Sequence, residues 1–236
     1  MVGLNRQHTA GDTVFDLKST SVREVNQYLH QPLDKSARIM IQNPAGAHNL
    51  AVGVDQPAQI EIHGHAGYYA AGMNEGANIR IRGNAGPGVA ENMMSGRVEV
   101  QGFASASAGA SAHGGLLVIR RDGGLRCGIS LKGADIVVGG DVGSFSAFMA
   151  QAGRLIVCGD AGEGLGDSLY EAVVYVRGKI KSLGMDARIE PMTDIDCSAV
   201  ALLLDRAEVD ASPQDFKRVA SARTLYHWNV NEHQEY

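Results

Sequence analysis

Glycines spaced 19 residues apart constrain the fold of this chain more than any other feature of its sequence. Six of them form one series, here called the comb: Gly64, Gly83, Gly102, Gly140, Gly159 and Gly178. Arg121 stands at the one position of the comb that lacks glycine. The residues four and two positions before each of the seven comb positions are aliphatic in all fourteen cases, beginning with Ile60 and Ile62. A second column, three residues after the comb, is mostly glycine: Gly67, Gly86, Ser105, Gly124, Gly143, Gly162 and Lys181.

Each repeat reads as a short strand followed by a corner. Aliphatic residues two apart indicate a strand with one buried face, and a nearby glycine permits positive φ or close backbone approach. One strand per 19 residues cannot form a core alone, but stacked coils bury a continuous ladder of side chains. We therefore predict an all-β fold, a right-handed parallel β-helix of about eight coils, since parallel crossovers are almost always right-handed. An earlier copy at Ile39 and Ile41 is offset by two extra residues near Pro57.

The distribution of glycine divides the chain into three parts. Of its 30 glycines, 28 lie between residues 38 and 184, and none follows. We assign residues 1–37 to an N-terminal strand and helix cap, 38–184 to the β-helix, and 185–236 to a C-terminal tail, helical with a terminal extended segment. Ser21 and Glu24 have the spacing of a capping box, which predicts a helix up to His30.

The tail carries weaker signals. Asp194 or Asp196 is expected to cap a helix that ends at Arg206, and Pro213 marks a second helix start. Residues 224–230 have the composition of a strand.

Charge and cysteine content exclude several classes of function. The net charge of −5 argues against nucleic acid or a membrane as the main partner, because either needs a concentrated basic patch. No run of 18 apolar residues is present, and residues 1–10 lack the layout of a secretion signal. Three cysteines without a Cys-x-x-Cys pair predict neither a disulfide framework nor structural zinc. We interpret the chain as cytoplasmic.

The column that faces outward between the two aliphatic ones changes character along the repeat. It reads Glu61, Arg80, Glu99, Val118, Val137, Ile156 and Tyr175. Stacked charges of alternating sign suit a solvated face, but the last four positions make an apolar stripe that something must cover. The cover is either the chain's own tail or a partner subunit, which makes these four residues candidate interface positions.

No catalytic, cofactor-binding or metal site is expected on this chain. His63 and His65 lie two apart, but the equivalent positions on the next coils are Arg82 and Gln101, so a third metal ligand is missing. We expect His63, His65 and Arg82 to be interface residues instead. Cys127 and Cys158 have no activating base nearby in the sequence, and the glycine-rich segment 162–166 is explained by the repeat.

The complete repeat resembles a known domain. Three copies carry the resemblance most clearly: Ile60-x-Ile62-x-Gly64-x-x-Gly67, Ile79-x-Ile81-x-Gly83-x-x-Gly86 and Leu155-x-Val157-x-Gly159-x-x-Gly162. They are similar to the glycine-repeat β-helix at the C-terminal end of the glutamate synthase large subunit, which is also found in the scaffold subunit of formylmethanofuran dehydrogenase. The resemblance covers residues 38–184, with departures at Ser105, Arg121 and Lys181.

The chain as a whole, with its N-terminal helix and the segment 222–227, resembles the stand-alone β-helix subunit of N-methylglutamate synthase. This resemblance implies a structural subunit of an FMN-dependent transferase that exchanges methylamine and ammonia on glutamate. Its partners would be an amidotransferase-like subunit and an FMN-barrel subunit, with FMN on the latter. A scaffold in a molybdenum or tungsten formylmethanofuran dehydrogenase is the alternative, and an independent carbohydrate-active β-helix is a third.

Overall fold

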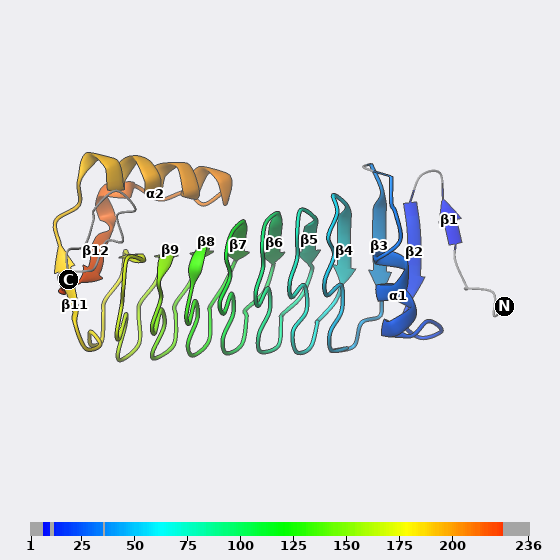
Figure 1. Ribbon diagram of the computed structural model, residues 1–236, viewed down its shortest axis with the longest axis horizontal. Coiled ribbons are helices and arrows are strands. Elements are labelled where there is room, and N and C mark those ends of the chain that lie inside the picture. Colours follow the sequence, from blue (N-terminus) through cyan, green and yellow to red (C-terminus); the bar gives the residue numbers. More distant parts are fainter. Residues whose placement is uncertain (1–6, 10–11, 35, 224–236) are drawn as a thin grey trace, which may run out of the picture.

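The computed structural model describes residues 7–9, 12–34 and 36–223, which form a rod built around one long sheet (Figure 1). The strand order in this sheet is β1-β2-β3-β4-β5-β6-β7-β8-β9-β10-β12-β11. The strands are β1 (Gln7–Thr9), β2 (Asp12–Asp16), β3 (Arg38–Gln42), β4 (Gln59–His63), β5 (Asn78–Ile81), β6 (Arg97–Val100), β7 (Leu116–Ile119), β8 (Lys132–Val138), β9 (Ala152–Val157), β10 (Val173–Val176), β11 (Ala187–Glu190) and β12 (Lys217–Ser221).

Strands β3 to β10 are parallel and stack in the register that the repeat predicts. Ile79 pairs with Ile60 on one side and with Val98 on the other. The offset is 19 residues at every step from β4 to β10, apart from a register shift at the start of β8, where Lys132 pairs with Ala152. It is 21 residues between β3 and β4, where Ile39 pairs with Ile60. The prediction of a parallel β-helix is confirmed, with seven turns between these eight strands.

The two aliphatic columns form the interior of the rod. All fourteen predicted positions, from Ile60 and Ile62 to Val174 and Val176, are at most 1% exposed. Burial of each such side chain contributes about 1.5–3 kcal/mol relative to exposure, so the ladder supplies most of the driving force for coil stacking. The column continues without a break into one apolar core that runs the length of the coils.

Left-handed backbone conformation occurs mainly away from the comb. In one coil Tyr69, Ala71 and Met73 have φ values of 57°, 57° and 54°, and the same alternation recurs at residues 145, 147 and 149. Among the comb glycines, Gly64 has a φ of 144°, and the others lie outside the positive range. Most comb glycines are therefore required for close approach and not for their φ.

The N-terminal end has the predicted strand and helix. Strand β2 pairs in parallel with β3, and helix α1 (Val22–Leu29) begins with a capping box between Ser21 and Glu24. Val25 and Leu29 are fully buried against the first coils, and the Asn26 side chain donates to the carbonyl of Asn49 at 2.8 Å. The helix thus closes this end of the apolar interior.

The C-terminal tail differs from the prediction in three respects. Helix α2 (Asp194–Arg206) has Thr193 as its N-cap, and Asp196 is the third residue of the capping box, so the expected caps were wrong. Pro213 starts only the single 3₁₀ turn η1 (Pro213–Asp215). The unexpected elements are β11 and β12, and β12 pairs antiparallel with β10, which covers the edge of the last coil.

The extended segment expected at 224–230 lies outside the described residues. Among the described residues, no helix combines the length and the apolar character that are needed to cross a membrane.

Candidate interaction surface

The comb glycines make room for side chains of the preceding coil. A Cβ added at Gly140 would overlap Asp122 Oδ1, and one at Gly102 would overlap Asn84 Oδ1. At Gly83 the added atom would lie 2.8 Å from His65 Nδ1, closer than real Cβ contacts. Any side chain at these positions would therefore push a polar atom of the neighbouring coil out of place.

Those polar atoms form a ladder of side-chain acceptors along one corner of the rod. The backbone N–H of Asp141 donates to Asp122 Oδ1 at 2.9 Å, and the N–H of Asp160 donates to Asp141 Oδ1 at 2.7 Å. The rungs, each between residues 19 apart, are His65–Asn84, Asn84–Phe103, Asp122–Asp141, Asp141–Asp160 and Asp160–Lys179. Sequence reasoning missed this ladder, although a His, Asn or Asp directly after a comb position is its visible signal.

The ladder also explains why Arg121 is tolerated. The coil before Arg121 carries Phe103 at the acceptor position, and a phenyl ring offers no acceptor to a neighbouring N–H. The glycines of the second column have a different role. An added Cβ at Gly86 or Gly124 would lie 2.7 Å from the backbone of the coil before it, so only glycine allows this contact. The same holds for Gly143 and Gly162.

The apolar stripe on the outward face is covered by the chain's own tail. Val118, Val137, Ile156 and Tyr175 are at most 2% exposed and form a second core with α2 and Phe216. Figure 1 shows α2 lying along the rod over β7 to β10. Of the two covers that the sequence allowed, the structure has the tail, so these four candidate interface residues pack within the chain.

A buried polar cluster anchors the start of α2. The Tyr175 hydroxyl donates to Asp196 Oδ1 at 2.6 Å, and Arg218 Nε contacts the same oxygen at 3.2 Å. The other carboxylate oxygen of Asp196 accepts from Thr193 Oγ1 at 2.6 Å. Burial raises the pKa of Asp196, but the hydrogen bonds from Thr193 and Tyr175 outweigh it and hold the pKa below its ordinary value.

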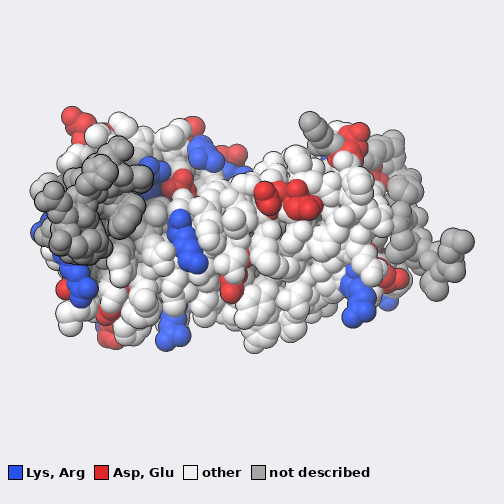
Figure 2. All heavy atoms as spheres, in the orientation of Figure 1, with Lys and Arg blue, Asp and Glu red and all other residues white. Residues whose placement is uncertain are grey.

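The other half of the outward face is open. A groove of about 520 Å³ lies over β3 to β6. Its lining is Asp12, Arg38, Ile39, Met40, Gln59, Ile60, Glu61, Asn78, Ile79, Arg80, Arg97 and Glu99. In Figure 2 the upper outline of the molecule dips between α2 and the end of the rod that carries β3. The charged half of the outward column is thus the floor of a depression, whereas the apolar half is covered.

Glu99 organises the groove at its border with α2. Its side chain is only 3% exposed, and three guanidiniums surround it: Arg120 at 2.7 Å, Arg97 at 3.1 Å and Arg80 at 3.4 Å. Burial raises the pKa of Glu99, but the hydrogen bonds from Arg120 and Arg97 hold it below its ordinary value. Glu99 therefore stays ionised at neutral pH.

Two of these arginines hold the C-terminal end of α2. Arg97 Nη1 donates to the carbonyl of Arg206 at 2.7 Å, and Arg120 donates to the carbonyl of Ala207. The last carbonyls of a helix carry partial negative charge, which favours cations there. The helix end, the arginines and Glu99 form one connected network.

The Glu61 carboxylate contacts two of the three residues, His63 and Arg82, that the sequence suggested as interface positions. His63 Nε2 lies 3.0 Å from Glu61 Oε2, and Arg82 Nη2 lies 2.8 Å from Glu61 Oε1. His65 is separate, since its Nδ1 accepts the backbone N–H of Asn84 at 3.0 Å. The structure therefore brings His63 and Arg82 together beside the groove and assigns His65 to the ladder.

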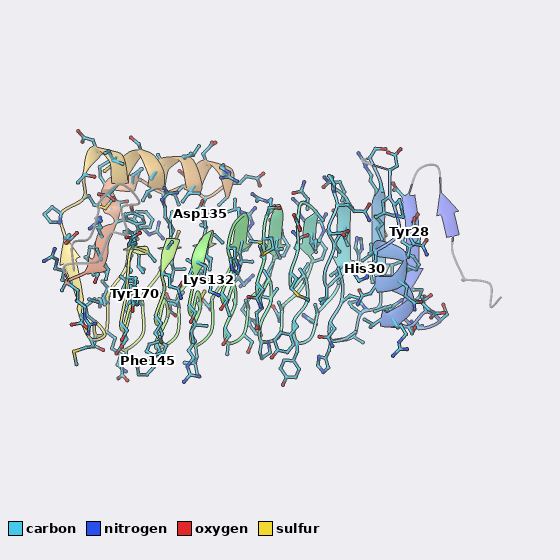
Figure 3. The ribbon with its side chains drawn as sticks, viewed as in Figure 1. Tyr28, His30, Lys132, Asp135, Phe145 and Tyr170 are labelled. Carbon is cyan, nitrogen blue, oxygen red and sulfur yellow. The ribbon has the colours of Figure 1, made fainter. Side chains whose placement is uncertain are left out.

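Cys127 and Cys158 are buried in packing positions, whereas Cys197 and Asp135 are half-buried. Burial raises the pKa of Cys127 to about 12, and burial also raises the pKa of Cys158. Asp135 lies beneath α2 (Figure 3), where burial raises its pKa despite Arg154 at 3.3 Å. Among the described residues, no three His, Cys, Asp or Glu side chains are grouped so that they could hold a metal ion.

No known family profile matches the sequence. A curated protein does match: Protein GlxC of Rhizobium meliloti (strain 1021) is 52% identical over 226 residues. The chain belongs to the GlxC family. The match covers 94% of this chain and 99% of the relative, so it includes the coils together with most of both ends. Membership of the GlxC family thus rests on nearly the whole chain and not on the glycine repeat alone.

Proposed function

We propose that this chain is a non-catalytic structural subunit of a glutamate-synthase-like, FMN-dependent transferase of the N-methylglutamate synthase type. That reaction converts glutamate and methylamine to N-methylglutamate and ammonia. The chain braces an amidotransferase-like subunit and an FMN-barrel subunit, and the released amine passes between these partners.

The observation that carries the proposal is the stacking of the glycine repeat in a 19-residue register from β4 to β10. Every motif that resembles the glutamate synthase β-helix occupies an equivalent strand and corner, with Ile60, Ile79 and Val98 stacked directly on one another. Seven steps of about 4.8 Å make a rod of roughly 34 Å. Because neighbouring coils are joined at the strands and at the corners, such a rod keeps bound partners at a constant distance.

The titratable groups with shifted pKa support a structural role, because each is engaged in packing or pairing within the chain. Glu99 holds arginines against α2, and Asp196 caps that helix while accepting from Tyr175. The Cys127 thiol, with a pKa of about 12, stays protonated at neutral pH, whereas a nucleophilic cysteine acts as the thiolate. We therefore assign the chemistry to the other subunits.

The groove over β3 to β6 does not fit the implied cofactor. A flavin phosphate in it would meet the carboxylates of Glu61 and Glu99, which already occupy the neighbouring guanidiniums. The proposal accordingly places FMN on the barrel subunit.

Purification of the tagged full chain from its native host tests this function. We expect an amidotransferase-like chain and an FMN-bearing chain to co-purify in a fixed ratio, and methylamine-dependent formation of N-methylglutamate to require all three. A stable, colourless chain that elutes alone would contradict the proposal. Molybdenum or tungsten in the complex, in place of flavin, would favour the formylmethanofuran dehydrogenase scaffold.

A further inference from the structure

The apolar interior of the rod is closed at one end and open at the other. At the N-terminal end, Val25 and Leu29 of helix α1 are fully buried against the first coils. A solenoid needs such a cap at each end, because the interior of a terminal coil has no neighbouring coil to cover it. At the opposite end of the rod β11 is the last strand of the sheet, and no described element follows it in the strand order (Figure 1).

One interior column runs into β11 and ends there in an exposed side chain. Val174 of β10 pairs with Val219 of β12, which pairs in turn with Ile189 of β11. Val174 and Val219 are at most 1% exposed, whereas Ile189 is 53% exposed. Met185, which precedes β11, is exposed as well. The last layer of the rod thus leaves open a column that each earlier layer covers with the next strand.

The last described residues of the chain lie beside this opening. The N–H of Ala222 donates to the carbonyl of Asp186 at 2.6 Å, and the Arg223 guanidinium contacts the Asp186 carboxylate. Residues 224–236, here called the terminal segment, therefore start next to the first residue of β11. Thirteen residues can span about 43 Å at 3.3 Å per residue, whereas the four residues of β11 span about 13 Å. The terminal segment is thus long enough to cross the whole last layer.

The sequence of the terminal segment has one apolar face. Tyr226, Trp228 and Val230 alternate with His227 and Asn229, and side chains two apart lie on the same face of an extended chain. Aromatic and β-branched residues favour that conformation. The charged residues of the segment, two glutamates, come after this face in the sequence, so no charge has to be buried with it. Such a face is suited to cover an opening lined by aliphatic side chains.

We propose that the terminal segment caps the C-terminal end of the apolar interior, with Trp228 packed on Ile189. The chain's own segment is favoured over a partner protein or a second copy, because a short linker holds it at an effective concentration in the millimolar range. With both ends closed, the rod does not stack end to end on a second copy. The inference goes beyond the proposed function and does not depend on it.

The test uses the fluorescence of Trp228, which is the only tryptophan of the chain and reports on the terminal segment directly. Acrylamide quenching measures its accessibility in the folded full chain at several chain concentrations, and in the urea-unfolded chain. The variants are Ile189→Asp and the milder Ile189→Ser. The matched control is Leu125→Asp, because Leu125 is 56% exposed but lies between β7 and β8. Circular dichroism verifies that each variant is folded.

We expect Trp228 to be protected from acrylamide equally in the unaltered chain and in Leu125→Asp, at every chain concentration. Ile189→Asp should raise the undocked fraction of the terminal segment by about tenfold, since burial of one aliphatic side chain is worth about that factor. Ile189→Ser should act in the same direction.

Two results would overturn the inference: a Trp228 that is as accessible in the folded chain as in urea, or equal protection in the Ile189 variants and the control. Protection that appears only at high chain concentration would assign this end to a second copy, and would overturn it too. These measurements need no partner subunit. Co-purification with an FMN-bearing chain therefore tests the proposed function separately.

Discussion

The fit between comb glycine and acceptor side chain predicts a specific energetic coupling at Gly140. Alanine there places a Cβ on Asp122 Oδ1, whereas its next contacts, the backbone carbon and oxygen of Arg121, lie at 3.1 and 3.2 Å and need a shift of only a few tenths of an ångström. The carboxylate must move, which breaks its 2.9 Å hydrogen bond from the N–H of Asp141. Overpacking and loss of a hydrogen bond to a charged group each cost about 1–3 kcal/mol. We expect Gly140→Ala to lower the free energy of unfolding by about 2 kcal/mol.

A double-mutant cycle isolates the cause. Asp122→Ala removes the acceptor, at a cost of about 1 kcal/mol because the site is exposed. In that background the added Cβ meets only the Arg121 backbone, at 3.1 and 3.2 Å, and the reduced freedom of the unfolded chain offsets the small cost of that contact, so Gly140→Ala should be about neutral. The two substitutions should therefore couple by about 2 kcal/mol. The assay is urea unfolding followed by far-ultraviolet circular dichroism, with m-values compared across the four proteins.

Arg121→Ala is the matched control, because Arg121 stands at the comb position whose preceding coil offers Phe103. A change within about 0.5 kcal/mol is expected there. Strictly additive effects of Asp122→Ala and Gly140→Ala, or an Arg121→Ala variant as unstable as Gly140→Ala, would refute the reasoning.

Three further predictions concern the tail and the groove. Tyr175→Phe removes the hydroxyl that donates to Asp196, so it should lower the free energy of unfolding by about 1–2 kcal/mol and make hydrogen exchange in α2 faster. The control Tyr170→Phe, at an exposed site, should change neither quantity. The pKa of Asp196 is lower in the folded chain than its ordinary value of 3.8, so near that pH the unfolded chain binds more protons than the folded chain. The stability that Asp196 contributes is therefore complete above pH 3.8 and is lost as the pH falls through the folded pKa. Acid unfolding of Asp196→Asn should accordingly show a weaker dependence of stability on pH than the unaltered chain. Glu99→Gln removes the carboxylate that three guanidiniums contact, and it should lower the melting temperature by about 2–4 °C for each kcal/mol of stability lost. Hydrogen exchange at the C-terminal end of α2 should become faster, and unchanged exchange there would contradict the network.

The coils were predictable because a solenoid places residues one period apart in the sequence next to each other in space. For that reason the stacking of Ile60, Ile79 and Val98 could be predicted from the sequence. The change from charged to apolar residues in the outward column, between Glu99 and Val118, could be predicted in the same way. The acceptor ladder also obeys the period. The sequence analysis explained the comb glycines by positive φ or close backbone approach, and it did not consider that most of them also make room for a polar side chain of the neighbouring coil.

The tail has no period, and its position could not be predicted. Strand β12 is five residues long, and its pairing with β10 joins Tyr175 to Arg218, 43 positions further along the chain, where the repeat has already ended. The apolar stripe showed that a cover was needed, but an apolar surface accepts many partners of similar composition. Only the folded chain shows that α2 supplies it.

By itself the sequence determined the parallel stacking, the buried columns and the closed N-terminal end, because each follows from local pattern repeated at a constant interval. The tertiary structure alone decided that α2 stops at Arg97 and Arg120 and leaves the groove over β3 to β6 open. That boundary depends on contacts between residues 87 to 109 positions apart. Such contacts are selected by the packing energy of the whole chain and leave no periodic trace in it.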